Sequence, residues 1–171
     1  MKDLSPSPTI PSFEDMRAAH HRIRTYIQET PILTSSYLND EVGAELFFKC
    51  ENFQKAGAFK VRGASNAVFG LSDEEAKAGV CTHSSGNHAL SLSYAAGRRG
   101  IPCNVVMPRT APEAKKAAVR GYGGTITECE PSTTSREAVF AEVPAAPGGN
   151  FVHPYSAARV LAGQGTCRYE M

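Results

Sequence analysis

Short apolar runs alternate with amphipathic stretches from about residue 72 to residue 153. Apolar runs bounded by turn residues predict buried strands, and apolar residues three and four positions apart predict helices. The expected helices cover 72–78, 87–99, 112–120 and 134–143, and the expected strands cover 80–82, 103–107, 125–129 and 150–153. This alternation predicts an α/β fold, with a parallel sheet covered by helices on both faces. In such sheets, ligands bind where a strand ends and the next helix begins.

The first part of the chain is less regular. Residues 1–11 are rich in Ser and Pro and are expected to form a loose arm. Ser12 and Asp15 resemble a capping box, which predicts a helix whose apolar face reaches Ile27. This helix should end at Thr30-Pro31, because the residue before a proline disfavours the helical conformation. The other elements expected in this part are a strand at 45–50 and a helix at 60–69.

Composition narrows the classes of function. The 171 residues include 18 Lys+Arg and 17 Asp+Glu, a net charge of +1 that gives no electrostatic reason to expect nucleic acid or an anionic membrane as partner. No apolar run approaches the ~18 residues of a membrane-spanning helix, and the first residues lack the features of a targeting peptide. The five cysteines are widely spaced, which argues against a disulfide framework or a zinc site. We therefore expect a cytoplasmic protein.

The segment from Thr82 to His88 lies where a strand is expected to pass into a helix. Unpaired backbone N–H groups at a helix start can hold a carboxylate or a phosphate. Ser84, Ser85 and Asn87 would add hydrogen-bonding side chains, and the glycine between them allows close approach of a ligand. The same residue types are also favoured as helix caps, so the pattern alone leaves both interpretations open.

Lys60 is flanked by Phe59 and Val61 at the expected start of a helix. A lysine enclosed by apolar neighbours loses hydration, which lowers its pKa and favours the neutral amine. A neutral amine can form an imine with an aldehyde. An exposed helix lysine is the alternative, and spacing does not separate the two.

Two segments together, Gly57-Ala-Phe-Lys60-Val-Arg-Gly-Ala64 and Ser84-Ser-Gly-Asn-His88, resemble the pyridoxal-phosphate enzymes of fold type II, the tryptophan synthase β-like group. Within this group they are most similar to the family of serine racemases and serine/threonine dehydratases. Further segments that match the family pattern lie at 30–36, 46–51, 107–112, 129–131 and 163–166. The resemblance covers roughly residues 12–166.

The resemblance implies a role for each of these residues. Lys60 would hold pyridoxal 5′-phosphate as a Schiff base and then act as the base at the substrate Cα. Phe59 would pack beside the cofactor, and Asn87 would bond to its ring hydroxyl. Ser85 would reach the opposite face of Cα, as the second catalytic group. The residues implied to bind the substrate carboxylate are Ser84, Ser85, Gly86, Asn87 and His88.

The resemblance also implies partners. The substrate would be a small hydroxy amino acid, serine or threonine, and the full-length form would be a homodimer. Ser35, Ser36 and Lys55 occupy positions that bind nucleotide in the animal racemases, although Ala56 departs from the pattern there. ATP and a divalent metal are possible in the full-length family, but the metal ligands are not expected in this chain.

Family members continue past the 163–166 motif into further parts of a large domain, so we expect a C-terminally truncated copy. Residues 1–77 would be the N-terminal segment of the large cofactor-binding domain, 78–152 the small α/β domain, and 153–171 a return to the large domain. The expected function is that of a pyridoxal-phosphate-dependent ammonia-lyase or racemase. The alternative is a non-catalytic family member that binds an amino acid or a full-length partner. A nucleotide-binding module has least support, because no phosphate loop is present.

Overall fold

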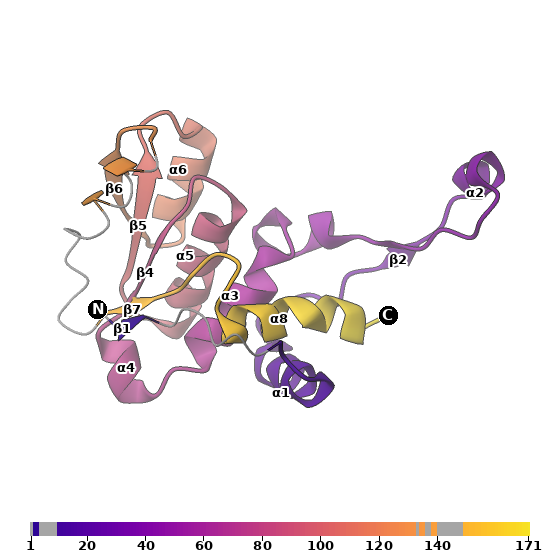
Figure 1. Ribbon diagram of the computed structural model, residues 1–171, viewed down its shortest axis with the longest axis horizontal. Helices are drawn as coiled ribbons and strands as arrows, with labels where there is room; N and C mark the ends of the chain where they lie inside the picture. Colours follow the sequence, from indigo (N-terminus) through magenta and orange to yellow (C-terminus); the bar gives the residue numbers. More distant parts are fainter. Residues whose placement is uncertain (1, 4–9, 133, 136–137, 140–148) are drawn as a thin grey trace.

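The computed structural model describes residues 2–3, 10–132, 134–135, 138–139 and 149–171. Three parts follow one another along its longest axis: an α/β unit, a group of helices, and a protruding arm (Figure 1). No helix in the described ranges is both long and apolar enough to span a membrane.

The α/β unit contains a five-stranded sheet in the order β1-β7-β4-β5-β6, in which every neighbouring pair is parallel. The predicted parallel sheet is thus confirmed. The strands are β1 (Lys2–Asp3), β4 (Val80–His83), β5 (Cys103–Pro108), β6 (Thr125–Cys129) and β7 (Asn150–Phe151). The expectation that residues 1–11 form a loose segment was wrong for Lys2–Asp3, because the backbone there pairs with the edge of β7.

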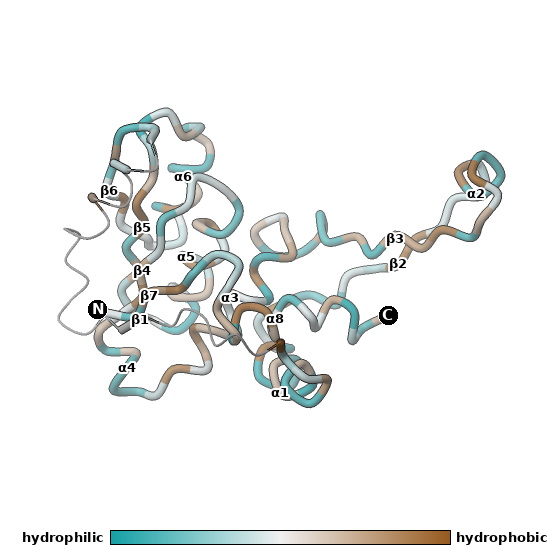
Figure 2. Tube along the Cα trace, viewed as in Figure 1, coloured by the Kyte–Doolittle hydropathy of each residue, from teal (hydrophilic) through white to brown (hydrophobic). Residues whose placement is uncertain are grey.

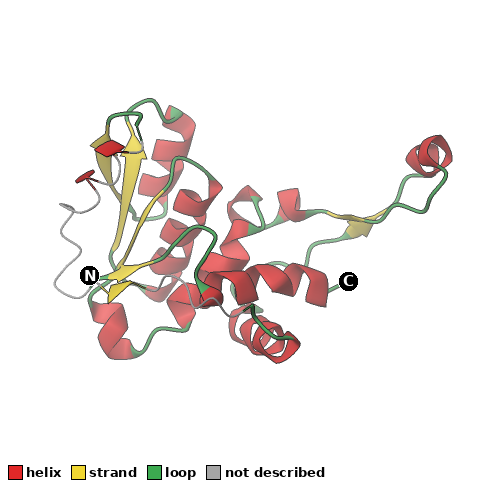
Figure 3. Cartoon of the chain, in the orientation of Figure 1, coloured by secondary structure: helices red, strands yellow, loops and turns green. Residues whose placement is uncertain are grey.

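Helices cover one face of this sheet (Figure 3). A continuous apolar core joins that face to α3 (Lys60–Phe69), α4 (Asp73–Lys77), α5 (Asn87–Arg99) and α6 (Glu113–Gly121). On the other face, Val139 packs against a smaller cluster that includes Cys81 and Val106. The helix expected at 134–143 lies partly outside the described residues, but 134–135 and 138–139 are helical.

Three helices, α1 (Phe13–Ile23), α3 and α8 (Ala158–Tyr169), pack beside the α/β unit. The sequence pattern does not predict α8, because two glycines lower its helix propensity. Gly163 is needed there for packing: a Cβ on it would lie 2.6 Å from the Arg62 carbonyl oxygen and 2.6 Å from Gly63 Cα. The backbones of α3 and α8 therefore cross in direct contact.

The capping box of Ser12 and Asp15 is present, but α1 ends at Ile23 rather than near Thr30. Beyond Ile23, bonds from other segments replace helical ones. Tyr94 donates a hydrogen bond to the carbonyl oxygen of Tyr26. The expectation of a longer helix was wrong because these tertiary bonds decide the backbone path.

The arm, residues 30–50, consists of β2 (Ile32–Leu33), α2 (Ser36–Val42) and β3 (Phe48–Lys49). The strands β2 and β3 pair antiparallel, and β3 is shorter than the strand expected at 45–50 because Leu46 N–H bonds to the Asn39 side chain instead. Two 3₁₀ helices, Glu51–Phe53 and Lys55–Gly57, lead from the arm to α3. Figure 2 shows apolar stretches along this arm. Its exposed large apolar side chains are Ile32, Leu33, Tyr37, Leu38, Val42, Phe47 and Phe48.

Candidate active site

Lys60 is the first residue of α3 and its side chain is half-buried. Its Nζ donates a hydrogen bond of 2.7 Å to the carbonyl oxygen of Pro154 and lies 5.4 Å from the centre of the Phe59 ring. Burial lowers the pKa of the Lys60 amine, because loss of water disfavours the charged form. Of the two interpretations that the sequence leaves open, the structure favours the enclosed lysine.

The loop at 84–86 connects β4 to α5. No side chain caps α5, and the Ser84 hydroxyl instead accepts a bond of 3.3 Å from the Gly86 amide. Ser85 and Asn87 are exposed, and their side chains make no hydrogen bond within the described residues. This arrangement favours a loop open to a ligand over a purely local cap.

The segment 152–154 brings Lys60 and this loop together. The Thr82 hydroxyl and His88 Nε2 both donate to the carbonyl oxygen of Val152, at 2.9 and 3.1 Å. Two residues further on, Pro154 accepts from Lys60. The end of β4, the start of α5 and the start of α3 are therefore fixed to one short segment.

His88 is 3% exposed, with its ring directed at Val152. A carbonyl oxygen can only accept, so the proton lies on Nε2 and Nδ1 keeps its lone pair. Nδ1 is buried and has no hydrogen-bond partner among the described residues. Burial lowers the pKa of His88 to about 4, and the charges of Lys60, His153 and His83 lower it further against the opposing effect of the Val152 bond. The ring is therefore neutral, and its predicted contact with the substrate stays a prediction.

A buried ionic network supports the first turn of α3 from the side of α8. Arg62, fully buried, binds Glu51 through Nε and Nη2 at 2.8 Å each, and Glu170 through Nη1 and Nη2 at 2.6 and 2.8 Å. Lys49 also contacts Glu170, at 2.7 Å. Burial by itself would raise the pKa of both carboxyl groups, but hydrogen bonds, chiefly from Arg62, outweigh it and hold both below their usual range. This network fixes the helix that carries Lys60.

The residues expected to bind nucleotide lie in two different elements. Ser35 accepts a bond from the Leu38 amide at the start of α2, and Ser36 is the first residue of that helix. Lys55 is exposed in the second 3₁₀ helix. No hydrogen bond or ion pair among the described residues joins Lys55 to the two serines. Their proposed role stays a prediction.

Sequence reasoning missed several residues around the site, namely Thr82, Arg62, Glu51, Glu170 and Lys115. Lys115 lies in the first turn of α6, and its Nζ would be 3.7 Å from a Cβ placed on Gly86. The carboxyl ends of parallel β4 and β5 lie side by side, and α6 follows β5. That topology was the available signal that a side chain from α6 can reach this loop.

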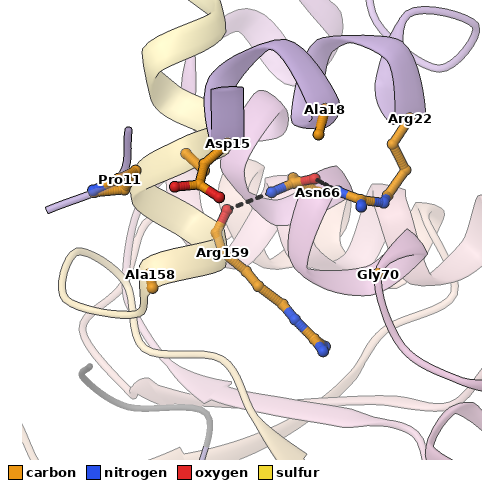
Figure 4. A pocket seen from close by; sticks show the side chains of 9 residues that line it. Pro11, Asp15, Ala18, Arg22, Asn66, Gly70, Ala158 and Arg159 are labelled. Carbon is orange, nitrogen blue, oxygen red and sulfur yellow. Dashed lines mark hydrogen bonds between the residues drawn. The ribbon is translucent and has the colours of Figure 1, made fainter. Parts of the chain in front are cut away.

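A cavity of about 280 Å³ lies elsewhere, between α1, α3 and α8 (Figure 4). In it, Asn66 accepts a hydrogen bond of 2.5 Å from Arg22 and donates one of 2.7 Å to the Arg159 carbonyl. Neither Lys60 nor the loop at 84–87 lines this cavity. Within the described ranges, no group of three His, Cys, Asp or Glu residues is placed to hold a metal ion.

Comparison with known families gives one match over most of the chain. Residues 23–171 match the model described as "Pyridoxal-phosphate dependent enzyme". The chain belongs to this family. The fold and the two motifs recognised in the sequence agree with it, so the predicted family is confirmed.

Individual members of the pyridoxal-phosphate-dependent enzyme family are similar over half their length. The chain is 70% identical over 162 residues to β-hydroxyaspartate dehydratase of Paracoccus denitrificans (strain Pd 1222), covering 95% of this chain and 51% of that protein. It is 51% identical over 163 residues to serine racemase of Homo sapiens, and the match covers 94% of this chain and 48% of that protein. The chain thus spans about half the length of the curated relatives it matches.

Solved structures of the family show the same fold. Serine racemase from Dictyostelium discoideum superposes with a TM-score of 0.90 at 46% identity, covering 95% of this chain and 53% of that one. Threonine deaminase isoform 2 from Solanum lycopersicum, in its processed form, gives a TM-score of 0.81 at 30% identity. This superposition covers 97% of this chain and 47% of that one. The arrangement of α3, β4 and α5 is therefore that of a fold-type II enzyme.

The residues near Lys60 are chemically suited to part of pyridoxal phosphate, the cofactor in the family's description. Lys60 offers an amine of lowered pKa, and the Phe59 ring, 43% exposed, lies beside it. Asn87 is exposed at an uncapped helix start. The donor set therefore suits an aldehyde and a neighbouring ring hydroxyl.

Proposed function

We propose that this chain carries the catalytic lysine and the substrate loop of a pyridoxal-phosphate-dependent dehydratase (ammonia-lyase) or racemase for small hydroxy amino acids. The observation that carries the proposal is the Lys60 amine, half-buried, of lowered pKa, and bonded to the segment that His88 and Thr82 fix. Serine, threonine and, from the name of the Paracoccus relative, β-hydroxyaspartate are the candidate substrates.

Pyridoxal phosphate, when bound, supplies an aldehyde that captures amines and a ring that stabilises negative charge at the substrate Cα. Lys60 would hold the aldehyde through Nζ, and its lowered pKa would keep that nitrogen able to react. The same nitrogen would take the proton from the substrate Cα. Phe59 and Asn87 would orient the ring.

The loop positions the amino acid. The uncapped start of α5 presents N–H groups to the carboxylate, and Ser84, Gly86 and His88 shape this end of the helix. Ser85, exposed on the loop, returns or removes a proton on the face of Cα opposite Lys60. Two groups on opposite faces permit inversion, whereas loss of the β-hydroxyl gives a keto acid and ammonia.

The attachment is tested by adding pyridoxal phosphate, reducing with borohydride and locating the pyridoxyl group by peptide mass spectrometry. We expect it on Lys60, and we expect Lys60→Ala to lose it. Lys55→Ala, which removes an exposed lysine five residues away, is the control and should label like the wild type. Labelling of other lysines with none on Lys60 would contradict the proposal.

Turnover is measured separately, as pyruvate from serine, 2-oxobutyrate from threonine, and D-serine from L-serine. Ser85→Ala should suppress racemisation more than elimination if Ser85 acts on the second face.

For the whole protein we also propose a homodimer, with ATP at Ser35, Ser36 and Lys55. A divalent metal would bind outside this chain.

A second candidate is a non-catalytic family member that binds an amino acid or a full-length partner. The arm favours it, because seven large apolar side chains are exposed there and such surfaces usually contact protein. Labelled Lys60 without any of the three products would support this candidate. Product formation that Lys60→Ala abolishes would contradict it.

A further inference from the structure

Two neighbouring lysines on α6 have different surroundings. Lys116 is buried and contacts Glu128 at 2.7 Å, Glu113 at 3.1 Å and the Arg109 carbonyl at 2.9 Å. Lys115 is half-buried, and its ammonium makes no hydrogen bond or ion pair with any described residue. Glu113 and Glu128 thus pair with Lys116, and no acidic side chain among the described residues neutralises the positive charge of Lys115.

The position of that charge is defined by Gly86. The Lys115 Nζ would be 3.7 Å from a Cβ on this glycine, so the ammonium lies against the backbone of the loop before α5. Strand pairing places it there: β4 leads into the loop, β5 leads into α6, and the Ser84 amide bonds to the Val106 carbonyl across the two strands at 3.1 Å. A side chain from one connection therefore reaches the next.

The loop now has two features that attract anions, and they come from different elements. One is the start of α5, which no side chain caps. The other is the Lys115 ammonium beside Gly86. An amino acid with one carboxylate can pair with one of them at a time. An amino acid with a second carboxylate on its side chain can pair with both.

We propose that Lys115 is a specificity-determining residue that binds the side-chain carboxylate of a dicarboxylic 3-hydroxy amino acid. The inference rests on the proposed function, in which the loop holds the α-carboxylate. It deepens that function by choosing a dicarboxylic substrate class over serine and threonine. The preference arises from ion pairing in a half-buried place, where a charge-assisted bond is stronger than in water.

The test is a titration of the isotope-labelled chain with DL-threo-3-hydroxyaspartate and with L-serine, following the amide NMR signals of residues 84–88. We expect the dicarboxylate to bind about tenfold more tightly than serine, the factor that one charge-assisted contact of about 1.4 kcal/mol supplies. Lys115→Met should weaken binding of 3-hydroxyaspartate about tenfold and change that of serine less than twofold.

Two further variants separate this role from general charge and from folding. Lys77→Met removes one lysine from the surface of α4, where it pairs with Glu74, and should leave the preference unchanged. Lys115→Arg keeps the charge and should keep most of the preference. Equal affinity of the wild type for both amino acids, no binding of either, or a preference that survives in Lys115→Met would overturn the inference.

The binding titration and the labelling of Lys60 are separate measurements, so failure of the inference can be told apart from failure of the proposed function. If Lys60 is labelled by pyridoxal phosphate while the preference is absent or does not depend on Lys115, the proposed function stands and the specificity role of Lys115 fails. If Lys60 is not labelled, the proposed function itself fails.

Discussion

The Nζ of Lys60 and the carbonyl oxygen of Pro154 lie 2.7 Å apart, although 94 positions separate the two residues in the chain. Pro154 follows Val152, whose carbonyl accepts from both Thr82 and His88. The amine is therefore held against a segment that the α/β unit fixes, while its own helix packs against α8. The proposed capture of the cofactor at Lys60 would therefore depend on both parts of the molecule.

Lys60 should become reactive at a lower pH in the folded chain than in the unfolded one. Burial lowers its pKa, so the neutral amine forms at lower pH in the folded state. We expect the midpoint of its pH–rate profile for acetylation, followed by peptide mass spectrometry, to shift downward relative to the same lysine in urea. A midpoint at or above that of the unfolded chain would show that burial does not control this amine.

Much of this site could be anticipated from local sequence. The strand at 80–83 and the glycine-containing loop after it follow from an apolar run that meets turn residues. Lys60 stands out through its apolar neighbours. Local pattern does not predict ion pairs between residues that are far apart in the sequence. Arg62, for example, binds Glu170, which lies 108 positions further along the chain. Lys115 and Lys116 are chemically identical neighbours, and only the turn of the helix decides which one meets Glu128 and which one meets the loop.

Arg62→Met should destabilise the fold by about 3–5 kcal/mol, because it leaves the carboxylates of Glu51 and Glu170 buried without their main partner. Urea unfolding monitored by circular dichroism measures this change. Arg17→Met is the matched control, since Arg17 pairs with Glu14 on the exposed surface of α1 and should change stability by less than about 0.5 kcal/mol. Equal stability of the two variants would mean that the buried network contributes little.

Gly163→Ala should cost about 1–3 kcal/mol of stability, because the added methyl group would meet backbone atoms of α3 that have no room to move. Gly121→Ala, at the end of α6, is the matched control. A Cβ there meets nothing within 4 Å, and alanine is the better helix former, so stability should hold or rise by up to about 1 kcal/mol. If Gly163→Ala proves neutral in urea unfolding, α3 and α8 do not cross as closely as described.

The free energy of unfolding should fall as the pH drops from 6.5 toward 4, through the titration of His88. Burial lowers the pKa of His88 to about 4 in the folded chain, against the ordinary 6.5 when unfolded. Between these values the unfolded chain binds a proton that the folded chain does not, so acid favours unfolding. The separation of the two pKa values corresponds to at most about 3 kcal/mol.

The His88 contribution can be isolated with a variant that keeps its hydrogen bond. Gln in place of His88 retains an N–H donor near the position of Nε2 and has no proton to gain in this range. The unfolding free energies of wild type and His88→Gln are measured in urea from pH 7 to pH 4. We expect them to converge as the pH falls, because only wild type loses stability through protonation of His88 in its unfolded chain. The carboxyl groups titrate in both proteins and cancel in the difference. A difference that stays constant with pH would mean that His88 is protonated as easily in the folded chain as in the unfolded one, and that the neutral ring bonded to Val152 is not its state.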